Sequence, residues 1–362
     1  MTRIRPMVAL AVVALTVAAC GGGGDESADS TAVDTTSTST TTTVKPTTTT
    51  ASTTSTTTTV PATIRQPLTG APLESEDQII QRPALVAKID NNASAVPNHS
   101  GLAVADIVFE EVVEGRTTRF AAVFHSQSSD PIGPIRSGRQ QDVDMFTSYD
   151  RPLFVWSGGN GGVTRLIDDS TLVNMGPNHA DGYYRGPGRA PHNLYNSTDT
   201  IWAQAPEGSV PPPQQFQYLD EGEDFPGLPS AGVQARVGTE NVEWIWNPEF
   251  NQFERSQRGR PHDDNVFGRI RATNVVVMAV EYLPSDVDRR SPNAQTVGSG
   301  QVWIWSGGEV IAGTWSREAS LFPIEFKDDN GNPIELTPGN TWIELADYAE
   351  VNAGLVTVLP PA

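Results

Sequence analysis

The chain is 362 residues long and strongly acidic, because 43 aspartates and glutamates outnumber 24 lysines and arginines and give a formal net charge of −19. A surface of this sign repels nucleic-acid phosphates and anionic lipid headgroups, so we expect no nucleic-acid partner and no basic membrane-binding patch. The length is sufficient for two domains of ordinary size.

The N-terminus predicts a bacterial lipoprotein signal over residues 1–19. Arg3 and Arg5 precede an apolar run that is too short to span a bilayer, and Cys20 follows it directly. Four glycines after Cys20, the only cysteine, argue against a buried structural thiol, and no intramolecular disulfide can form. We therefore predict cleavage before Cys20, its acylation with diacylglyceryl and palmitate chains, and anchoring to the extracytoplasmic face of the cell membrane.

Residues 20–75 are predicted to form a disordered tether. The Gly, Thr and Ser tract up to Pro61 contains no aromatic side chain and few aliphatic ones. Burial therefore cannot offset the entropy of ordering it. A solvated tether would hold the folded body off the membrane, and O-linked sugars on the tract are an alternative.

Residues 82–205 predict an N-terminal α/β domain with a mixed sheet. A buried strand leads into the Gly-rich turn 158–162 and then into a helix, which is an α/β arrangement. Apolar runs predict strands over 84–90, 107–113, 119–125 and 153–157. Helices are predicted over 140–146, over 163–168 and from about 197 to 203.

The remainder predicts a Pro-rich interdomain linker over 206–232 and a smaller, mainly antiparallel β domain over 233–358. Gly307-Gly308 is a two-residue hairpin signal. Short apolar runs separated by turns predict strands over 242–246, 252–257, 274–282, 301–306, 309–315 and 342–345. The expected fold class is therefore α+β.

Three arginines are the leading candidates for a binding site. Arg136 and Arg139 are three residues apart at a loop-to-helix entry, where helix N–H groups also favour an anion. Arg119 begins a nearby strand. Guanidinium groups suit phosphate or carboxylate, but each arginine could instead pair with a carboxylate such as Glu114.

Other polar residues at strand ends and in loops are weaker candidates. Asp90 and Glu110 could act as a base or bind magnesium, or could cap turns and neutralise an arginine. His192 could be a general acid or base, or could order its loop. His262, beside two aspartates, is expected on an exposed hairpin, with cation binding as the alternative. The full candidate set is Asp90, Asn91, Asp106, Glu110, Arg119, Arg136, Ser137, Arg139, Gly158, Gly159, His192 and Asn193.

No cofactor loop or metal site is predicted. The five histidines are far apart and lack the spacing of zinc ligands. The glycine run 158–162 lacks the lysine of a P-loop, and neither Ser137 nor Ser157 lies in a Gly-x-Ser-x-Gly elbow. We therefore expect no cofactor and name no catalytic residue.

Several segments together resemble the YerB-like bacterial lipoprotein family, a two-part domain of unknown function. The resemblance covers about residues 82–345 and implies a signal-bearing envelope lipoprotein without an assigned activity. The chain departs from the family pattern in the loop 158–162 and in the tract 174–188. The segments that carry it include Ile89-Asp90-Asn91, Ala105-Asp106-Ile107, Thr118-Arg119-Phe120, Ile135-Arg136-Ser137, Gly158-Gly159, His192-Asn193, Arg260-Pro261-His262 and Asn340-Thr341-Trp342.

The functional expectation is a non-catalytic binding or accessory factor in the cell envelope, with an anionic cell-wall ligand or an envelope protein as partner. The first domain is also similar, in its order of elements, to the LytR-CpsA-Psr phosphotransferases. That likeness supplies the alternative: a metal-dependent enzyme acting on a polyprenyl-pyrophosphate-linked cell-wall precursor. In that case Asp90 or Asp106 would hold a divalent cation and the arginines would hold a pyrophosphate.

Overall fold

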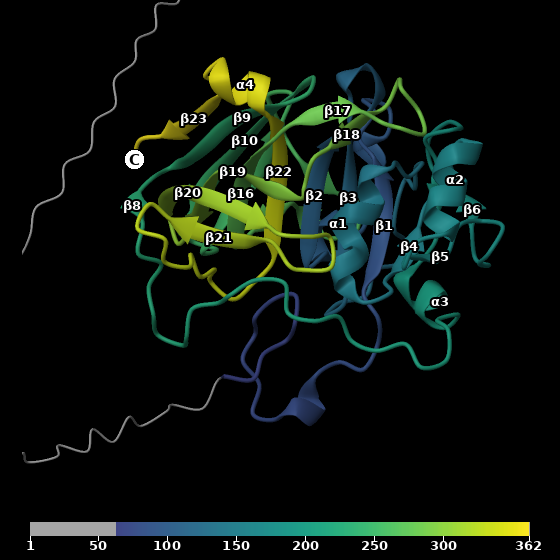
Figure 1. The fold of residues 1–362 in the computed structure, drawn as a ribbon, viewed down its shortest axis with the longest axis horizontal. Coiled ribbons are helices and arrows are strands. Elements are labelled where there is room, and N and C mark those ends of the chain that lie inside the picture. The colour runs from purple at the N-terminus through teal and green to yellow at the C-terminus, as the bar shows by residue number, and fades with distance from the viewer. Residues whose placement is uncertain (1–62, 362) are drawn as a thin grey trace, which may run out of the picture. The chain divides into compact units, whose positions relative to one another are not determined.

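A computed structural model describes residues 63–361, so the predicted signal peptide, Cys20 and the tether up to residue 62 lie outside the described residues. The main feature is one large mixed sheet (Figure 1). Its strands, in spatial order, are β21 (Glu325–Asp328), β20 (Glu309–Arg317), β19 (Gly298–Ser306), β16 (Asn274–Val280), β22 (Thr341–Asp347), β2 (Ile107–Val112), β3 (Thr118–Phe124), β1 (Leu85–Asp90), β4 (Leu153–Val155) and β5 (Val173–Asn174), while β8 (Leu228–Pro229) pairs with β20.

A second, antiparallel sheet contains β12 (Arg260–Pro261), β11 (Gln252–Gln257), β10 (Glu240–Asn247), β9 (Gly232–Val237) and β23 (Val356–Leu359), with β15 (Arg271–Ala272) beside β11. Three small pairs are β6 (Tyr184–Arg185) with β7 (Leu194–Tyr195), β13 (Asp263–Asp264) with β14 (Gly268–Arg269), and β17 (Tyr282–Pro284) with β18 (Pro292–Ala294). The α-helices are α1 (Gln141–Phe146), α2 (Gly161–Asp168), α3 (Thr198–Trp202) and α4 (Tyr348–Asn352).

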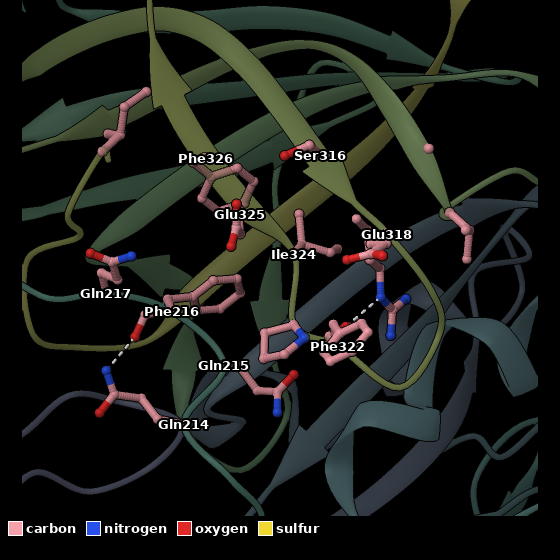
Figure 2. Close-up of a pocket in the computed structure, with 15 residues that line it drawn as sticks. Gln214, Gln215, Phe216, Gln217, Ser316, Glu318, Phe322, Ile324, Glu325 and Phe326 are labelled. Carbon is pink, nitrogen blue, oxygen red and sulfur yellow. Dashed lines mark hydrogen bonds between the residues drawn. The ribbon is translucent and has the colours of Figure 1, made fainter. Parts of the chain in front are cut away.

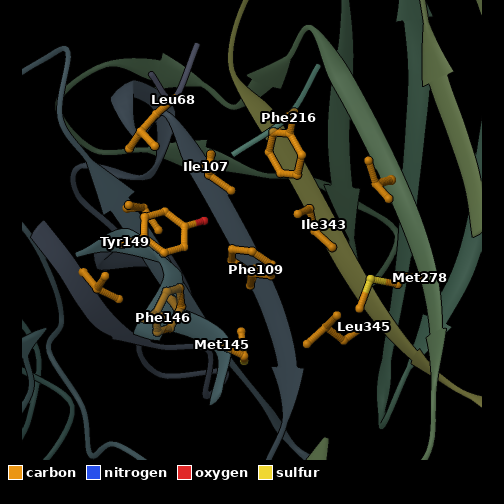
Figure 3. Packing of buried hydrophobic residues seen from close by; sticks show 14 of the residues in the cluster. Leu68, Ile107, Phe109, Met145, Phe146, Tyr149, Phe216, Met278, Ile343 and Leu345 are labelled. Atoms are coloured by element: carbon orange, nitrogen blue, oxygen red, sulfur yellow. The ribbon is translucent and has the colours of Figure 1, made fainter. Parts of the chain in front are cut away.

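The large sheet separates two hydrophobic cores, because alternate side chains of its strands point to opposite faces. On one face, Phe109 and Ile343 pack with Phe146 of α1 and with Leu68 (Figure 3). On the other face, the second sheet contributes Trp244 and other apolar side chains to a separate core. Strands buried on both faces read as continuous apolar runs, and β16 (Asn-Val-Val-Val-Met-Ala-Val) is such a strand.

The two halves of the chain meet in the middle of the large sheet. Strand β22, near the C-terminus, runs parallel to β2 on one side and to β16 on the other. Glu110 of β2 and Glu344 of β22 are register partners. The pairing of these strands therefore places two carboxylates side by side in the core.

A buried arginine from the second sheet compensates these carboxylates. Arg255 of β11 is bonded to Glu110 through Nη2, and its Nε lies 3.5 Å from Glu344. Trp244 Nε1 also donates to Glu344, at 2.9 Å. Burial raises the pKa of Glu110 to about 8, with Arg255 acting against this rise and Glu344 adding to it. The cluster thus ties both halves of the large sheet to the second sheet.

Two buried histidines extend this cluster toward the end of β1. Arg255 Nη1 donates to His262 Nδ1 at 2.7 Å, His262 Nε2 lies 2.8 Å from His99 Nδ1, and His99 Nε2 lies 2.6 Å from the Asp90 carbonyl oxygen. This chain of bonds requires both imidazoles to be neutral with the proton on Nε2. Burial lowers the pKa of His99 to about 4 and that of His262 well below its usual value.

The predicted fold class is confirmed, and most strands lie within a few residues of their expected bounds. The expected exposed hairpin at His262 is wrong, since this side chain is fully buried in the histidine chain. The tether was predicted to reach residue 75, whereas Leu68 is already buried in the core and Arg65 pairs with Asp220. None of the helices in residues 63–361 is long and apolar enough to cross a membrane.

The Pro-rich segment 206–232 packs against the large sheet over much of its length. Phe216, Tyr218, Leu219 and Phe225 are buried in the same core as Leu68. The hydroxyl of Tyr218 donates to the Leu68 carbonyl oxygen at 2.8 Å. Composition alone predicts a spacer here, but the segment's aromatic residues hold it on the sheet. The positions of the domain boundaries remain a proposal.

Acid should destabilise the fold through its buried histidines. The folded-state pKa of His99 is below its unfolded value near 6.5, so its contribution is complete above pH 6.5 and is lost as the pH falls toward 4. This loss is on the order of 3 kcal/mol. Glu110 acts oppositely, since its raised pKa makes stability fall as pH rises from 4.5 to 8.

His99→Gln isolates the histidine contribution from that of Glu110. Urea unfolding at pH 7 and pH 4 should show a smaller loss of unfolding free energy in the variant than in the wild type. Burial also lowers the pKa of His125 to about 4. His125 is present in both proteins, so its contribution to the pH dependence cancels in the comparison. Equal pH slopes in the two proteins would contradict the neutral state of His99.

Neither half of the chain should fold alone. Residues 63–230 would expose the edge of β2 and leave Glu110 without Arg255, and residues 231–361 would expose the edge of β22. We expect no cooperative melting of either piece by circular dichroism, and recovery when both are expressed together. A cooperatively melting N-terminal piece would show that the shared sheet is dispensable.

Candidate functional site

The three predicted arginines gather beyond the C-terminal ends of β1 and β4 in the large sheet. These strands are parallel, and ligands of α/β sheets bind beyond the carboxyl ends of such strands. Arg119 lies opposite Asp90 in the register of β3 and β1. The loop that carries Arg136 lies between the ends of β1 and β4. The Arg136 N–H donates to the Lys88 carbonyl, and the Arg136 carbonyl accepts from the Ser157 N–H.

The arginines share two carboxylates. Arg136 Nε lies 3.1 Å from Asp90 Oδ2. Arg139 Nη2 is bonded to Glu114, and Arg119 Nη2 lies 3.9 Å from the same Glu114 oxygen. Three guanidinium groups against two carboxylates leave one formal positive charge in a chain whose net charge is −19.

Burial and mutual repulsion characterise this cluster. Burial lowers the pKa of Arg119 to about 10, with the charge of Arg139 next in size and Arg136 adding to it. Burial acts to raise the pKa of Glu114, but hydrogen bonds from Arg139 and Ser291 outweigh it and hold this pKa at about 2. Glu114 is therefore ionised at neutral pH.

A small cavity of about 240 Å³ opens beside Arg139. The Nε atom of Arg139 is buried and has no hydrogen-bond partner among the described residues. Helix α2 begins here, with the Asn160 side chain accepting from the N–H groups of its first turn. The cavity is lined by Ser137, Arg139, Ser157, Gly158, Gly159, Asn160, Val163 and Asp288.

His192 joins the cluster on the side of Asp90. Its Nδ1 lies 2.5 Å from Asp90 Oδ2, the oxygen that also faces Arg136. The histidine loop thereby meets the end of β1, about a hundred residues earlier in the chain. An imidazole held through Nδ1 presents its Nε2 for binding or proton transfer.

Four predicted residues hold the structure around the site. Asp106 accepts from the N–H groups of His125 and Ser126 and so caps the turn after β3. Glu110 belongs to the Arg255 cluster described above. The Asn91 amide donates to Glu110 at 3.1 Å and to Thr118, and the Asn193 amide donates to two carbonyls of its own loop.

Sequence reasoning missed several cavity residues. Asn160 has a recognisable signal, since Asn before a short helix is a preferred cap. Asp288 had none, because it comes from the other half of the chain and reaches the cavity through a 3.0 Å bond from the Asn160 amide. Residues 63–361 hold no group of three or more His, Cys, Asp or Glu side chains that could bind a metal ion.

Comparisons with known proteins agree with this architecture. A curated Bacillus subtilis (strain 168) protein named "Putative lipoprotein YerB" is 28% identical over 306 residues, which is 80% of this chain and 89% of that protein. The crystal structure of the YerB protein from Bacillus subtilis matches with a TM-score of 0.69 at 24% identity, covering 82% of this chain and 99% of that one, and supports the fold.

Two family models match in order along the chain. Residues 68–210 match the N-terminal domain, and residues 233–343 the C-terminal domain, of a protein family of unknown function, DUF3048. Together the matches span more than half of the chain, and they include Arg255, Glu110 and the arginine site. The chain therefore belongs to the DUF3048 family of YerB-like lipoproteins.

Proposed function

We propose that this lipoprotein is anchored to the extracytoplasmic face of the cell membrane and acts there as a non-catalytic binding or accessory factor. Its ligand would be an anionic group of a cell-wall component or of an envelope protein. The observation that carries this proposal is the arginine cluster, in which three guanidinium groups face two carboxylates.

The cavity beside the arginine cluster has a size that suits a small anionic group. Its volume of about 240 Å³ is below the usual range for a whole organic ligand, about 300–1,000 Å³, so one phosphate or carboxylate of a larger molecule fits best. Arg139 Nε has a free N–H, and the first turn of α2 begins at the cavity wall. The Arg139 guanidinium favours an anion. The first-turn N–H groups are already capped by Asn160, and the carboxylate of Asp288 on the same wall is offset by Arg290 at 3.4 Å.

The alternative, a metal-dependent phosphotransferase, has weaker support. The oxygens predicted to hold a cation are engaged elsewhere: Asp106 caps a turn, and Asp90 faces Arg136 and His192. Turnover of a polyprenyl-pyrophosphate-linked substrate with magnesium, lost in Asp90→Asn, would overturn the binding-factor proposal.

Arg136→Gln should weaken anion binding. The Arg136 side chain is 23% exposed, so it can contact a ligand directly. Loss of a hydrogen bond to a charged group costs roughly 1.5–3 kcal/mol, or about ten-fold or more in Kd. Calorimetric titration of the full chain with inorganic pyrophosphate measures this change.

The matched control is Arg260→Gln, which removes the same charge from an exposed position outside the cluster. It should leave the Kd for pyrophosphate within about two-fold, since exposed charges are largely screened. Equal weakening by both substitutions would reduce the effect to net charge and contradict a built site.

The anchor is tested at Cys20. Cys20→Ser removes the thiol that would carry the lipid, so the chain should leave the membrane fraction or retain its uncleaved signal. Fractionation followed by mass spectrometry of the N-terminus distinguishes these results from normal processing. A cleaved variant that remains with the membranes would show that the anchor lies elsewhere.

A further inference from the structure

A second cavity, of about 830 Å³, shares no residue with the arginine cluster. It lies where the segment between the two family domains meets β20 and β21, and its size is typical of a site for a whole small molecule. It is lined by Gln214, Gln215, Phe216, Gln217, Val297, Gly298, Ser316, Arg317, Glu318, Phe322, Pro323, Ile324, Glu325, Phe326 and Ile334.

Aromatic and aliphatic side chains form much of the wall. The rings of Phe216 and Phe326 stack with their centroids 5.6 Å apart. Figure 2 shows these two rings, Ile324 and Phe322 around the same space. Phe322 is 53% exposed. An apolar ligand body would cover part of this exposed surface.

The one buried cation of the wall, Arg317, is only partly satisfied. Its Nε donates to the Phe322 carbonyl and its Nη2 to the Ser320 carbonyl, both at 2.6 Å, and Nη2 also donates to Ser148 Oγ. These acceptors are all neutral. The Nη1 atom is buried without a partner.

Arg317 differs in this respect from the other buried arginines of residues 63–361. Arg119, Arg139 and Arg255 each have a carboxylate within 4 Å, whereas Arg317 has none. Asp144 attracts Arg317 only from beyond ion-pair distance. A buried charge without a carboxylate in contact is unfavourable, as is a buried N–H without an acceptor. A negatively charged ligand would supply the missing counter-ion and a hydrogen-bond acceptor.

We propose that this cavity binds an amphipathic organic monoanion. The apolar body would pack against Phe216, Phe326 and Phe322, and a carboxylate would accept from Arg317. Because the Nη1 atom is buried, binding requires the side chains that cover it to shift. Glu318 and Glu325 also line the cavity, which favours a single negative charge over a higher one.

Titration of the full chain with dodecanoate, dodecyl phosphate and dodecyl maltoside, each below its micelle concentration, tests the class of ligand. We expect saturable binding of dodecanoate, and at least about ten-fold weaker binding of the neutral maltoside. Dodecyl phosphate, which carries nearly two negative charges at neutral pH, should bind more weakly than dodecanoate, and tighter binding of the phosphate would contradict the preference for a single charge. Absence of saturable binding, or equal binding of the maltoside, would overturn the proposal.

Two neighbouring side chains provide a matched pair of variants. Phe322→Ser removes an exposed ring from the cavity, whereas Leu321→Ser removes a 67% exposed side chain that does not line it. The first should weaken binding of the anion about ten-fold and the second should not, and neither should change the melting temperature much. Equal effects of the two substitutions on binding would show that the anion does not bind in this cavity.

Arg317→Gln tests the headgroup contact. The anion should lose at least about ten-fold in affinity, while any weak binding of the maltoside stays unchanged. Because Arg317 also holds the 317–322 turn, the melting temperature is measured in parallel, and Phe322→Ser carries the test if this variant unfolds. A folded Arg317→Gln variant with unchanged affinity for the anion would overturn the proposal.

Discussion

The pairing of β2 with β22 is the contact on which the rest of the molecule depends. It joins the two family domains into one sheet and brings Glu110 and Glu344 together in the core. Two adjacent carboxylates are tolerated there because Arg255 reaches them from the second sheet and because Glu110 has a raised pKa. Removal of Arg255 alone would leave buried acids uncompensated, which is far worse than never having buried them.

Asp90 connects this core to the arginine cluster. Its main-chain carbonyl accepts from His99, the last member of the chain that begins at Arg255, while its carboxylate faces Arg136 and His192 at the sheet edge. Asp90 therefore contacts the buried histidines through its carbonyl and the arginine cluster through its carboxylate. A positive cluster in so acidic a chain also attracts anions only at short range, since the surrounding surface repels them.

The sequence was informative where local patterns decide the structure. Apolar runs located β1, β2 and β16, and the arginine spacing indicated residues that the fold does bring together. Long-range contacts left no such trace. Arg255 carries no local sign that it pairs with Glu110, and the aromatic residues of a Pro-rich segment did not reveal that Tyr218 bonds to Leu68. Composition describes how a segment behaves alone, whereas packing depends on partners far along the chain.

The central place of β22 has a consequence for biogenesis. The strand ends at Asp347, so the middle of the sheet is filled only after nearly the whole chain is available. Until then β2 offers an unpaired edge, and the contacts that close the sheet span more than two hundred residues, which makes closure slow. Late closure therefore extends the period in which the apolar strands of an unfinished chain are exposed and prone to aggregate.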